Sequence, residues 1–442
     1  MAVTKTTTTS YGSRVKSSFG GIGTGFVMFL IGTCLLWWNE GRAVKTAKML
    51  AEAEKVAVHI DDVSEVDPSL TGQLIHATAQ AVTNEELQDE NFGFSTVAIK
   101  LNRDVEYYQY VENTTSQTKD KLGGSQETTT TYTYKKSWTS SPVNSSEFED
   151  PAYQGKNFTL MEFDDADYVS ENVTFGGYTL NKSLIMGISG SVPSKLNIEE
   201  SLLKAWDTNI SRTQATPTSK ALAEAAAKLA KETVEAADST KSDSATTEVV
   251  DNRYEYVHVS KNVVYFGKNP NSPQIGDVRV TFTQVNPGLV SVLAQVEGST
   301  FVPFKAKNGK TLSVITMGNK SMEQMFEQQE QANNTWLWVL RIIGILLVCG
   351  GLKGIFAILS TILKVVPFLS SIMNWGVNLI CNIIGIAWSL IVIAIAWIFY
   401  RPVLAIAILA VVVGIVGYFV YRGKQKKPAE VEVPEAPAAP EA

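Results

Sequence analysis

The sequence predicts an integral membrane protein with four transmembrane α-helices and a large β-rich (α+β) extracytoplasmic or lumenal domain. Residues 335–422 contain no Asp or Glu and only five basic side chains, although the whole chain of 442 residues carries 44 acids. Residues 19–38 form a second apolar stretch, and strand patterns recur through the 296 residues between the two stretches. Soluble domains do not leave 88 residues so poor in charge, so a purely soluble protein is excluded.

The first apolar stretch, residues 19–38, has 20 residues without a charge. As a helix it extends about 30 Å, which is enough to cross a bilayer. A cleaved signal peptide is the alternative, but its apolar region is usually only ~7–15 residues long and is followed by small residues. This stretch ends in two tryptophans followed by Asn39 and Glu40. We therefore expect a membrane anchor, helix 1, preceded by a short N-terminal segment, residues 1–18.

The C-terminal apolar block divides into three further helices. Residues 335–363 hold helix 2 and, from Lys353, an amphipathic segment that either lies at the membrane interface or forms the inner end of a tilted span. Residues 373–400 and 403–421 form helices 3 and 4, and Pro402 suits the start of a helix because no amide donor is needed there. The tail, residues 422–442, is predicted to be disordered.

Basic residues orient these helices. Arg422 and three lysines follow helix 4 directly, whereas the turn between helices 3 and 4 holds only Arg401. Because Lys and Arg accumulate in cytoplasmic loops, the C-terminus is predicted to be cytoplasmic. Four crossings then place the N-terminus in the cytoplasm too, and residues 39–334 on the opposite side of the membrane.

Strand patterns dominate residues 39–334. They are rich in β-branched and aromatic residues and are separated by Gly, Pro and Asn. They occur at residues 95–100, 105–111, 128–138, 254–259, 262–266, 277–283 and 290–295. Helical patterns occur at residues 198–206 and 218–237, of which the second is expected to be a solvated insertion. Ser321 and Gln324 have the spacing of a capping box and predict a helix that leads into helix 2.

No set of residues indicates catalysis or ligand chemistry. The three histidines lie at no metal-ligand spacing, the three cysteines fall in apolar stretches, and no phosphate-binding loop occurs. The acidic residues at 162–167 lack the pattern of a calcium loop and indicate a solvated turn. A net charge of −6 argues against nucleic acid as a partner. We therefore expect no enzyme, no cofactor and no bound metal.

Small and polar residues within the apolar helices are candidates for helix packing and self-association. Two glycine pairs have the spacing that permits close helix approach: Gly21 with Gly25, and Gly350 with Gly354. Three asparagines recur every four residues on one face of helix 3: Asn374, Asn378 and Asn382. Packing within one bundle, self-association and a polar conduit are the alternatives, and a conduit would normally need more charge.

One acid lies near three guanidinium groups at the predicted outer interface. We predict that Glu40 pairs with Arg42, Arg341 or Arg401, because partial desolvation at this depth strengthens such bonds.

Six segments follow one another in an order that is familiar from a known family. They are residues 38–44 (WNEGRAV), 92–93, 103–110, 273–280, 302–304 and 396–402 (AWIFYRP). Together they resemble the transmembrane protein 43 family, named LUMA in animals, over nearly the whole chain. Two of the segments supply motifs at the outer interface, which contain Asn39, Glu40, Gly41 and Arg42, and Tyr400, Arg401 and Pro402.

The resemblance implies four spans, cytoplasmic termini and a lumenal domain. Animal members are endomembrane proteins that self-associate and organise nuclear-envelope partners such as emerin and lamins. Bacterial relatives exist, to which those partners do not carry over, and we expect a bacterial member. The expected location is a bacterial inner membrane, or the endoplasmic reticulum and nuclear envelope if the chain is eukaryotic.

The leading hypothesis is a non-enzymatic membrane scaffold. It would form homo-oligomers in the lipid bilayer and bind a protein or lipid partner through its extracytoplasmic domain. The first alternative is a channel or transporter subunit whose lumen includes the three asparagines. The second is an extracytoplasmic sensor whose tail engages a cytoplasmic partner.

Overall fold

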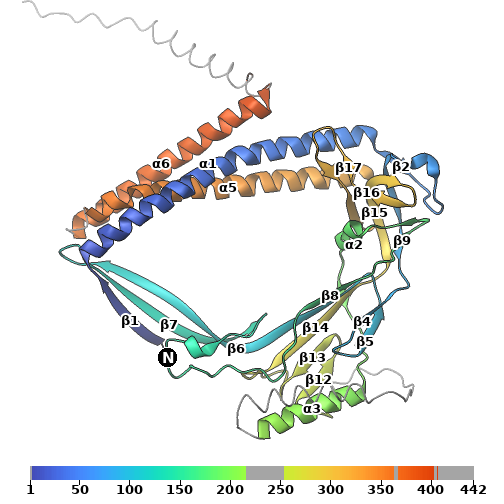
Figure 1. The fold of residues 1–442 in the computed structure, drawn as a ribbon, viewed down its shortest axis with the longest axis horizontal. Helices are drawn as coiled ribbons and strands as arrows, with labels where there is room; N and C mark the ends of the chain where they lie inside the picture. The colour runs from blue at the N-terminus through green and yellow to red at the C-terminus, as the bar shows by residue number, and fades with distance from the viewer. Residues whose placement is uncertain (1, 216–252, 363–366, 403–405, 407–442) are drawn as a thin grey trace, which may run out of the picture. The chain divides into compact units, whose positions relative to one another are not determined.

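A computed structural model of the chain describes residues 2–215, 253–362, 367–402 and 406 (Figure 1). It divides into two units. Unit 1 comprises Met1–Ser17, Thr46–Ala332 and Thr361–Ser371, and unit 2 comprises Ser18–Lys45, Asn333–Ser360 and Ile372–Ala442. The predictions for residues 218–237, helix 4 (403–421) and the tail (422–442) fall outside the described residues, except for the single residue 406.

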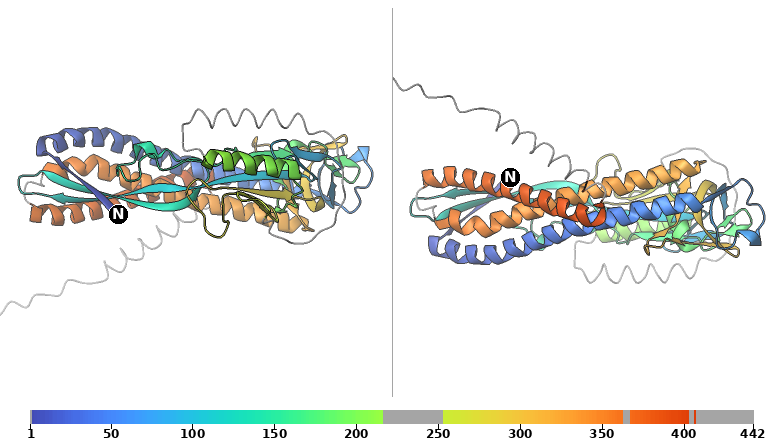
Figure 2. Two further views of the ribbon diagram at one scale, coloured as in Figure 1. Left: turned by 90° about the horizontal axis from the view of Figure 1, so that it is seen from below. Right: turned by 90° about the horizontal axis from the view of Figure 1, so that it is seen from above.

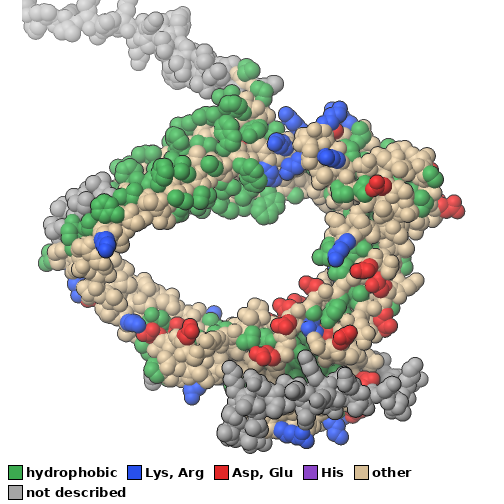
Figure 3. All heavy atoms as spheres, in the orientation of Figure 1, with side chains coloured by type: hydrophobic (Ala, Val, Ile, Leu, Met, Phe, Trp, Pro, Cys, Tyr) green, Lys and Arg blue, Asp and Glu red, His purple; other side chains and the backbone are tan. Residues whose placement is uncertain are grey.

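Three long helices form the described part of unit 2 and extend beyond it. They are α1 (Tyr11–Val56), α5 (Met322–Ile362) and α6 (Pro367–Tyr400). Within the described residues, three helices are long and apolar enough to cross a membrane, namely Tyr11–Val56, Met322–Ala357 and Gly376–Tyr400. These correspond to the first three predicted spans. On the face shown in Figure 3, apolar side chains cover much of the surface of these helices, as expected where lipid replaces water.

The start of α5 bears out the predicted capping box. The backbone N–H of Gln324 donates to Oγ of Ser321, and the backbone N–H of Ser321 donates to Oε1 of Gln324, both at 3.2 Å. From there α5 continues without a break to Ile362, so the amphipathic segment predicted from Lys353 belongs to the same helix.

The larger sheet of unit 1 has eight strands. In spatial order its path is β1 (Ala2–Thr9), β7 (Gln126–Thr139), β6 (Lys100–Asp120), β14 (Val278–Val285), β13 (Val263–Phe266) and β12 (Val257–Ser260), with β8 (Ala166–Val169) on β6 and β11 (Val192–Pro193) on β14. An aromatic core that includes Phe92, Phe282 and Trp206 packs against it. Trp206 lies on α3 (Glu200–Ala215), which begins later and ends later than the predicted helix at 198–206.

The second sheet of unit 1 has seven strands. They are β2 (Val58–Ile60), β3 (Leu74–Val82), β9 (Thr174–Phe175), β10 (Tyr178–Thr179), β16 (Thr300–Val302), β15 (Gly288–Glu297) and β19 (Val314–Met317). Because β15 also pairs with β3, the strands β3, β9, β10, β16 and β15 form a closed ring of pairings. Buried aliphatic and aromatic side chains such as Ile75, Phe175 and Val292 fill its core.

Unit 1 also contains short elements among its described residues. They are the strand pairs β4 (Glu86–Asp89) with β5 (Phe94–Val97) and β17 (Phe304–Lys305) with β18 (Thr311–Leu312), helix α2 (Lys182–Gly187), and two 3-10 turns, Pro68–Leu70 and Ser145–Glu147. The sequence patterns at 105–111, 128–138, 262–266, 277–283 and 290–295 all fall on strands. The pattern at 95–100 is divided between β5 and β6, and β12 covers the end of the pattern at 254–259.

The N-terminus is a strand of the larger sheet, which the sequence did not predict. β1 pairs antiparallel with β7, with Thr4 opposite Thr131, and the same strands can be followed in Figure 2. Lys5 on β1 forms an ion pair with Glu149 at 2.8 Å. Residues 2–17 therefore belong with the β-rich unit in this structure.

This pairing conflicts with the predicted topology. If residues 19–38 cross the bilayer once, residues 1–18 and 39–334 lie on opposite sides of the membrane. Lipid does not accommodate the polar backbone of an open sheet, so a bilayer cannot separate two strands that share backbone hydrogen bonds. The β1–β7 sheet and a single crossing by residues 19–38 therefore exclude each other within one chain.

Candidate functional site

Unit 2 holds a buried carboxylate that joins its three described helices. Glu40 on α1 has no exposed surface. Its Oε1 accepts a hydrogen bond from Nε of Arg341 on α5 at 2.6 Å, and its Oε2 accepts one from Nε1 of Trp397 on α6 at 2.9 Å. The pairing predicted for Glu40 is confirmed, and Arg341 is the partner.

Arg341 is buried and lies close to two indole rings. Its guanidinium carbon lies 4.9 Å from the ring centre of Trp338 and 5.8 Å from that of Trp397. The charge-assisted bond to Glu40 and the two ring faces compensate the guanidinium for the water that it has lost. Breaking a buried pair by removing one partner leaves an uncompensated charge, so Glu40, Arg341 and Trp397 act as one structural cluster.

Two asparagines and an arginine link α1 to α5 beside this cluster. Nδ2 of Asn39 donates to the carbonyl of Leu337 at 2.9 Å, and its Oδ1 accepts from Nε of Arg42 at 3.2 Å. Nη1 of Arg42 donates to Oδ1 of Asn333 at 3.2 Å, and Nδ2 of Asn333 donates to the carbonyl of Ala43 at 3.0 Å. Nη2 of Arg42 is buried without a hydrogen-bond partner among the described residues.

The remaining motif residues pack around the same helix ends. Gly41 lies against the ring of Tyr400, so closely that an added Cβ would come within 2.7 Å of its Cζ. The backbone N–H of Arg401 donates to the carbonyl of Trp397 at 2.7 Å, and Pro402 follows in helical conformation. The structure thus brings the motif at 39–42 against the end of α6, through contacts with Trp397 and Tyr400.

Glycines allow the backbones of α1 and α5 to touch. A Cβ on Gly25 would lie 2.7 Å from the carbonyl oxygen of Gly351, and one on Gly354 would lie 2.9 Å from Cα of Gly25. A Cβ on Gly21 would lie 3.9 Å from the carbonyl oxygen of Gly354. A Cβ on Gly350 would have Cε of Met28 as its nearest atom, at 3.5 Å. The predicted glycine pairs therefore lie at contacts within the chain, and Gly351 is the partner that the spacing did not single out.

Of the three predicted asparagines of α6, the two with described side chains do not join this cluster. Asn378 is exposed and Asn382 is half-buried, while the side chain of Asn374 lies outside those that the structure describes. The carbonyl of Asn382 lies 3.8 Å from Sγ of Cys349 on α5. Ser389, further along the helix, is buried and donates to the carbonyl of Gly385 at 2.7 Å.

Sequence reasoning missed the tryptophans as hydrogen-bond donors. Nε1 of Trp397 bonds Glu40, and Nε1 of Trp388 donates to Oγ1 of Thr33 at 3.1 Å. The sequence does indicate such bonds, because an indole N–H in an apolar helix needs an acceptor and these helices contain few acceptors. The partner itself depends on helix rotation, which no single-helix pattern specifies.

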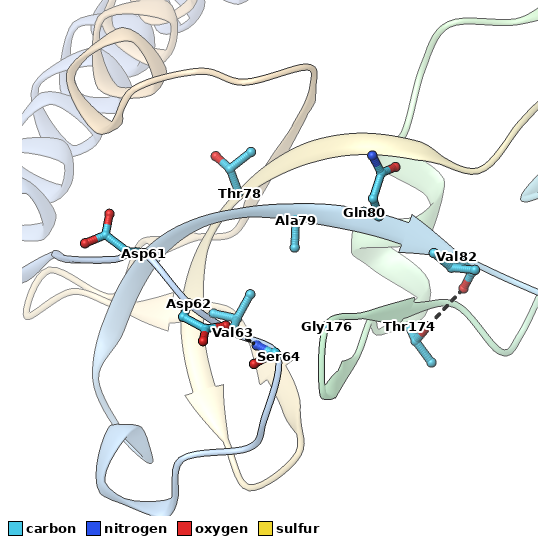
Figure 4. Close-up of a pocket in the computed structure, with 10 residues that line it drawn as sticks. All are labelled: Asp61, Asp62, Val63, Ser64, Thr78, Ala79, Gln80, Val82, Thr174 and Gly176. Atoms are coloured by element: carbon cyan, nitrogen blue, oxygen red, sulfur yellow. Dashed lines mark hydrogen bonds between the residues drawn. The ribbon is translucent and has the colours of Figure 1, made fainter.

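Unit 1 contains a small polar recess beside β3, with a volume of about 290 Å³ (Figure 4). Its lining includes the acidic pair Asp61 and Asp62, and residues of β3 and β9. The carboxylate of Asp62 accepts from the backbone N–H of Ser64 at 2.8 Å, and this hydrogen bond lowers its pKa. Among the described residues no group of three or more potential ligands could hold a metal ion.

Apolar helices held together by a buried ion pair, in one chain with a β-rich unit, define a multi-pass integral membrane protein. The family described as Transmembrane protein 43 matches residues 107–402, and the chain belongs to this family. It is 28% identical to Transmembrane protein 43 of Rattus norvegicus over 404 residues, covering 89% of this chain and 87% of the relative.

Other members show a similar extent of likeness. Transmembrane protein 43 of Homo sapiens is 28% identical over 407 residues, covering 89% of this chain and 88% of the relative. The homolog of Drosophila melanogaster is 24% identical over 394 residues, covering 87% of this chain and 90% of the relative. No solved structure matches the chain.

Proposed function

We propose that the chain is a non-enzymatic membrane scaffold. Its helices associate laterally into homo-oligomers, and its β-rich domain binds a protein or lipid partner outside the bilayer. The observation that carries this proposal is that polar side chains around Glu40 bond to one another across the described helices. Both carboxylate oxygens of Glu40 are occupied by donors from α5 and α6, and Asn39 and Asn333 bond to neighbouring groups on α1 and α5.

Polar groups that bond to one another brace a bundle, whereas a conduit for ions or solutes needs polar groups that face a path. This contrast favours a scaffold over the channel or transporter alternative. The glycine contacts between α1 and α5 add to the same argument, because they bring two helix backbones together and leave no space between them.

The exposed face of α6 is the surface proposed for self-association. Asn378 lies there beside Leu379 and Ile380, and all three are exposed. An amide exposed to lipid is unfavourable, and a second copy of the helix would supply its hydrogen-bond partner.

Cross-linking in native membranes tests this proposal. We expect homo-oligomers for the natural chain, and a smaller cross-linked fraction for the double variant Asn378→Leu with Asn382→Leu. The comparison variant is Leu379→Ala with Ile383→Ala, which alters the adjacent exposed positions and keeps both amides, so its cross-linked fraction should fall less. A strictly monomeric natural chain would contradict the scaffold, and ion or solute flux through reconstituted protein would favour the channel alternative.

The location forms part of this proposal. Arg422 and the lysines that follow it favour a cytoplasmic C-terminus. The membrane is a bacterial inner membrane, or the endoplasmic reticulum and nuclear envelope if the chain is eukaryotic. A cytoplasmic N-terminus requires that β1 separate from β7.

A further inference from the structure

The hairpin of β6 and β7 in unit 1 has a polar outer half and one apolar side chain at its tip. Residues 113–131 contain Leu122 as their single aliphatic or aromatic residue. Leu122 lies in the turn between the two strands, and it is 83% exposed. The hairpin therefore presents one leucine at its end, with no other aliphatic or aromatic side chain within nine residues on either side.

The turn that carries this leucine, residues 121–125, is closed by its own backbone. The backbone N–H of Lys121 donates to the carbonyl of Ser125 at 2.8 Å, and that of Gly124 donates to the carbonyl of Lys121 at 3.1 Å. Gly123 and Gly124 have φ of +86° and +81°, which glycine adopts without strain. The side chain of Leu122 is therefore not needed to hold the turn, and its exposure calls for a partner outside the hairpin.

This hairpin tip, residues 121–125, is attached to the start of α1. Arg14 of α1 is buried, and its Nη2 lies 2.8 Å from Oδ1 of Asp120 in an ion pair. Its Nη1 donates to the carbonyl of Gly124 at 2.6 Å. The ring of Tyr11 lies against Gly124, where an added Cβ would come within 2.5 Å of Cδ2 of the ring.

The same helix enters its apolar stretch shortly after this contact. Phe19 is the first residue of that stretch and follows Arg14 by five residues, a rise of about 7.5 Å along α1. A helix that enters lipid at Phe19 has Arg14 at the level of the lipid headgroups. The hairpin tip, bound to Arg14, then lies at the membrane surface.

The charges around the hairpin tip suit an anionic membrane surface. Residues 10–18 and 119–127 together carry four basic and two acidic side chains, a net charge of +2, in a chain whose net charge is −6. Both acids form ion pairs with basic residues of the same set. The other two basic residues, Lys16 and Lys119, are exposed. Exposed lysines beside an exposed leucine are a combination that binds anionic phospholipid surfaces.

We propose that the hairpin tip binds the surface of the lipid bilayer, with Leu122 inserted among the headgroups of anionic phospholipids and Lys16 and Lys119 facing their phosphates. This inference deepens the proposed function, because it names a lipid surface as a partner of the β-rich domain. It also explains why β6 and β7 continue as a polar ribbon as far as the start of α1. The contact needs residues 2–17 and the hairpin on one side of the membrane, as in the β1–β7 pairing.

Fluorescence quenching in lipid nanodiscs tests this contact. The full-length chain, with its three native cysteines replaced by alanine, carries Leu122→Cys labelled with an environment-sensitive dye. Each nanodisc holds one chain and contains phospholipids with a nitroxide quencher near the headgroup. We expect several-fold stronger quenching than for Asn113→Cys, the matched control, which is exposed on β6 nine residues away, about 30 Å along an extended strand.

The lysines are tested in the same nanodiscs. Lys119→Glu should weaken the quenching at position 122 in anionic lipid and change it little in zwitterionic lipid, because only anionic headgroups attract the lysine. Lys135→Glu is the control, since Lys135 is exposed on β7 away from the hairpin tip, and it should leave the quenching unchanged.

Equal quenching at positions 122 and 113 would overturn the proposal. A change in dye emission without quenching by lipid would place a protein surface against Leu122 and would overturn it as well. A single chain in each nanodisc removes self-association from both readouts. The lipid contact and the scaffold can therefore fail separately.

Discussion

Glu40 makes the three described helices of unit 2 depend on a single side chain. Both of its oxygens are bonded, and its partner Arg341 has little exposed surface. Replacing Glu40 should cost a large free energy of unfolding, because the guanidinium of Arg341 is then buried with neither water nor a counter-ion.

We expect Glu40→Leu to lower the free energy of unfolding by about 3–5 kcal/mol, the cost of leaving one charge of a buried pair without its partner. Glu54→Leu is the matched control, because Glu54 lies on the same helix and is exposed. The double variant Glu40→Leu with Arg341→Leu should recover part of the loss. Thermal unfolding in nanodiscs measures all three. Equal stability of the Glu40 and Glu54 variants would contradict a structural role for the ion pair.

A buried aspartate of unit 1, Asp277, predicts the direction in which stability changes with pH. Burial raises the pKa of Asp277 above its ordinary value of 3.8, although Tyr265 and Gln274 donate hydrogen bonds to it. The folded state therefore keeps this proton at a pH where the unfolded state has lost it. The stability that Asp277 contributes is present below pH 3.8 and is lost as the pH rises through its raised folded-state value.

Asp277→Asn should flatten this part of the pH dependence, which amide-exchange protection of β13 and β14 between pH 3 and 7 would measure. Asp62 supplies the contrast. Its pKa is lowered by Ser64, so its contribution is present above pH 3.8 and is lost as the pH falls. If the two Asn variants changed the pH dependence in the same direction, the assigned causes would be wrong.

Among the helices, the close approach of the α1 and α5 backbones requires glycine at particular positions of α1. Gly25→Ala should destabilise the contact between α1 and α5 by about 1–3 kcal/mol, because its methyl group meets backbone atoms that cannot turn aside. Gly23→Ala is the control. A Cβ at Gly23 meets no described atom within 4 Å, so this change should be neutral or stabilising by up to ~1 kcal/mol. Thermal unfolding of the two variants in one lipid composition decides between these outcomes.

Elements with a local signal were predictable from the sequence. The capping box at Ser321, the apolar runs of the first three spans and the strand β7 depend on neighbours within a few residues, and each is present. The same applies to Glu40, because an isolated acid near three guanidinium groups has few other ways to offset its burial. Short strands such as β9 and β10 have two residues each, which is too few to show an alternation of apolar and polar residues.

Contacts that depend on how elements are rotated or paired were not predictable. The choice of Trp397 as the second donor to Glu40 follows from the orientation of α6, and the meeting of His59 with His76 follows from the register of β2 on β3. The eight residues of β1 read as a polar threonine-rich segment, and they become a strand only because β7 offers an edge of matching length.

For the whole molecule, the decisive question is which side of the membrane holds the N-terminus. Thr4→Cys with Thr131→Cys tests it, with the native cysteines replaced by alanine. These positions are opposite one another in the β1–β7 register, and opposed residues of antiparallel strands have Cα atoms ~4.5–5.5 Å apart, within disulfide range. We expect this pair to form a disulfide in native membranes, because the register places the two strands in contact.

The control pair is Thr4→Cys with Ser137→Cys, because Ser137 lies opposite Gln109 on β6 and far along β7 from the partner of Thr4. A disulfide in the first pair alone places residues 1–17 and the β-rich domain on one side of the membrane, and residues 19–38 then cannot cross once. The opposite outcome is no disulfide, with membrane-impermeant labelling of position 131 from one face and of position 4 from the other. That outcome would restore the cytoplasmic N-terminus and show that β1 leaves the sheet once helix 1 is inserted.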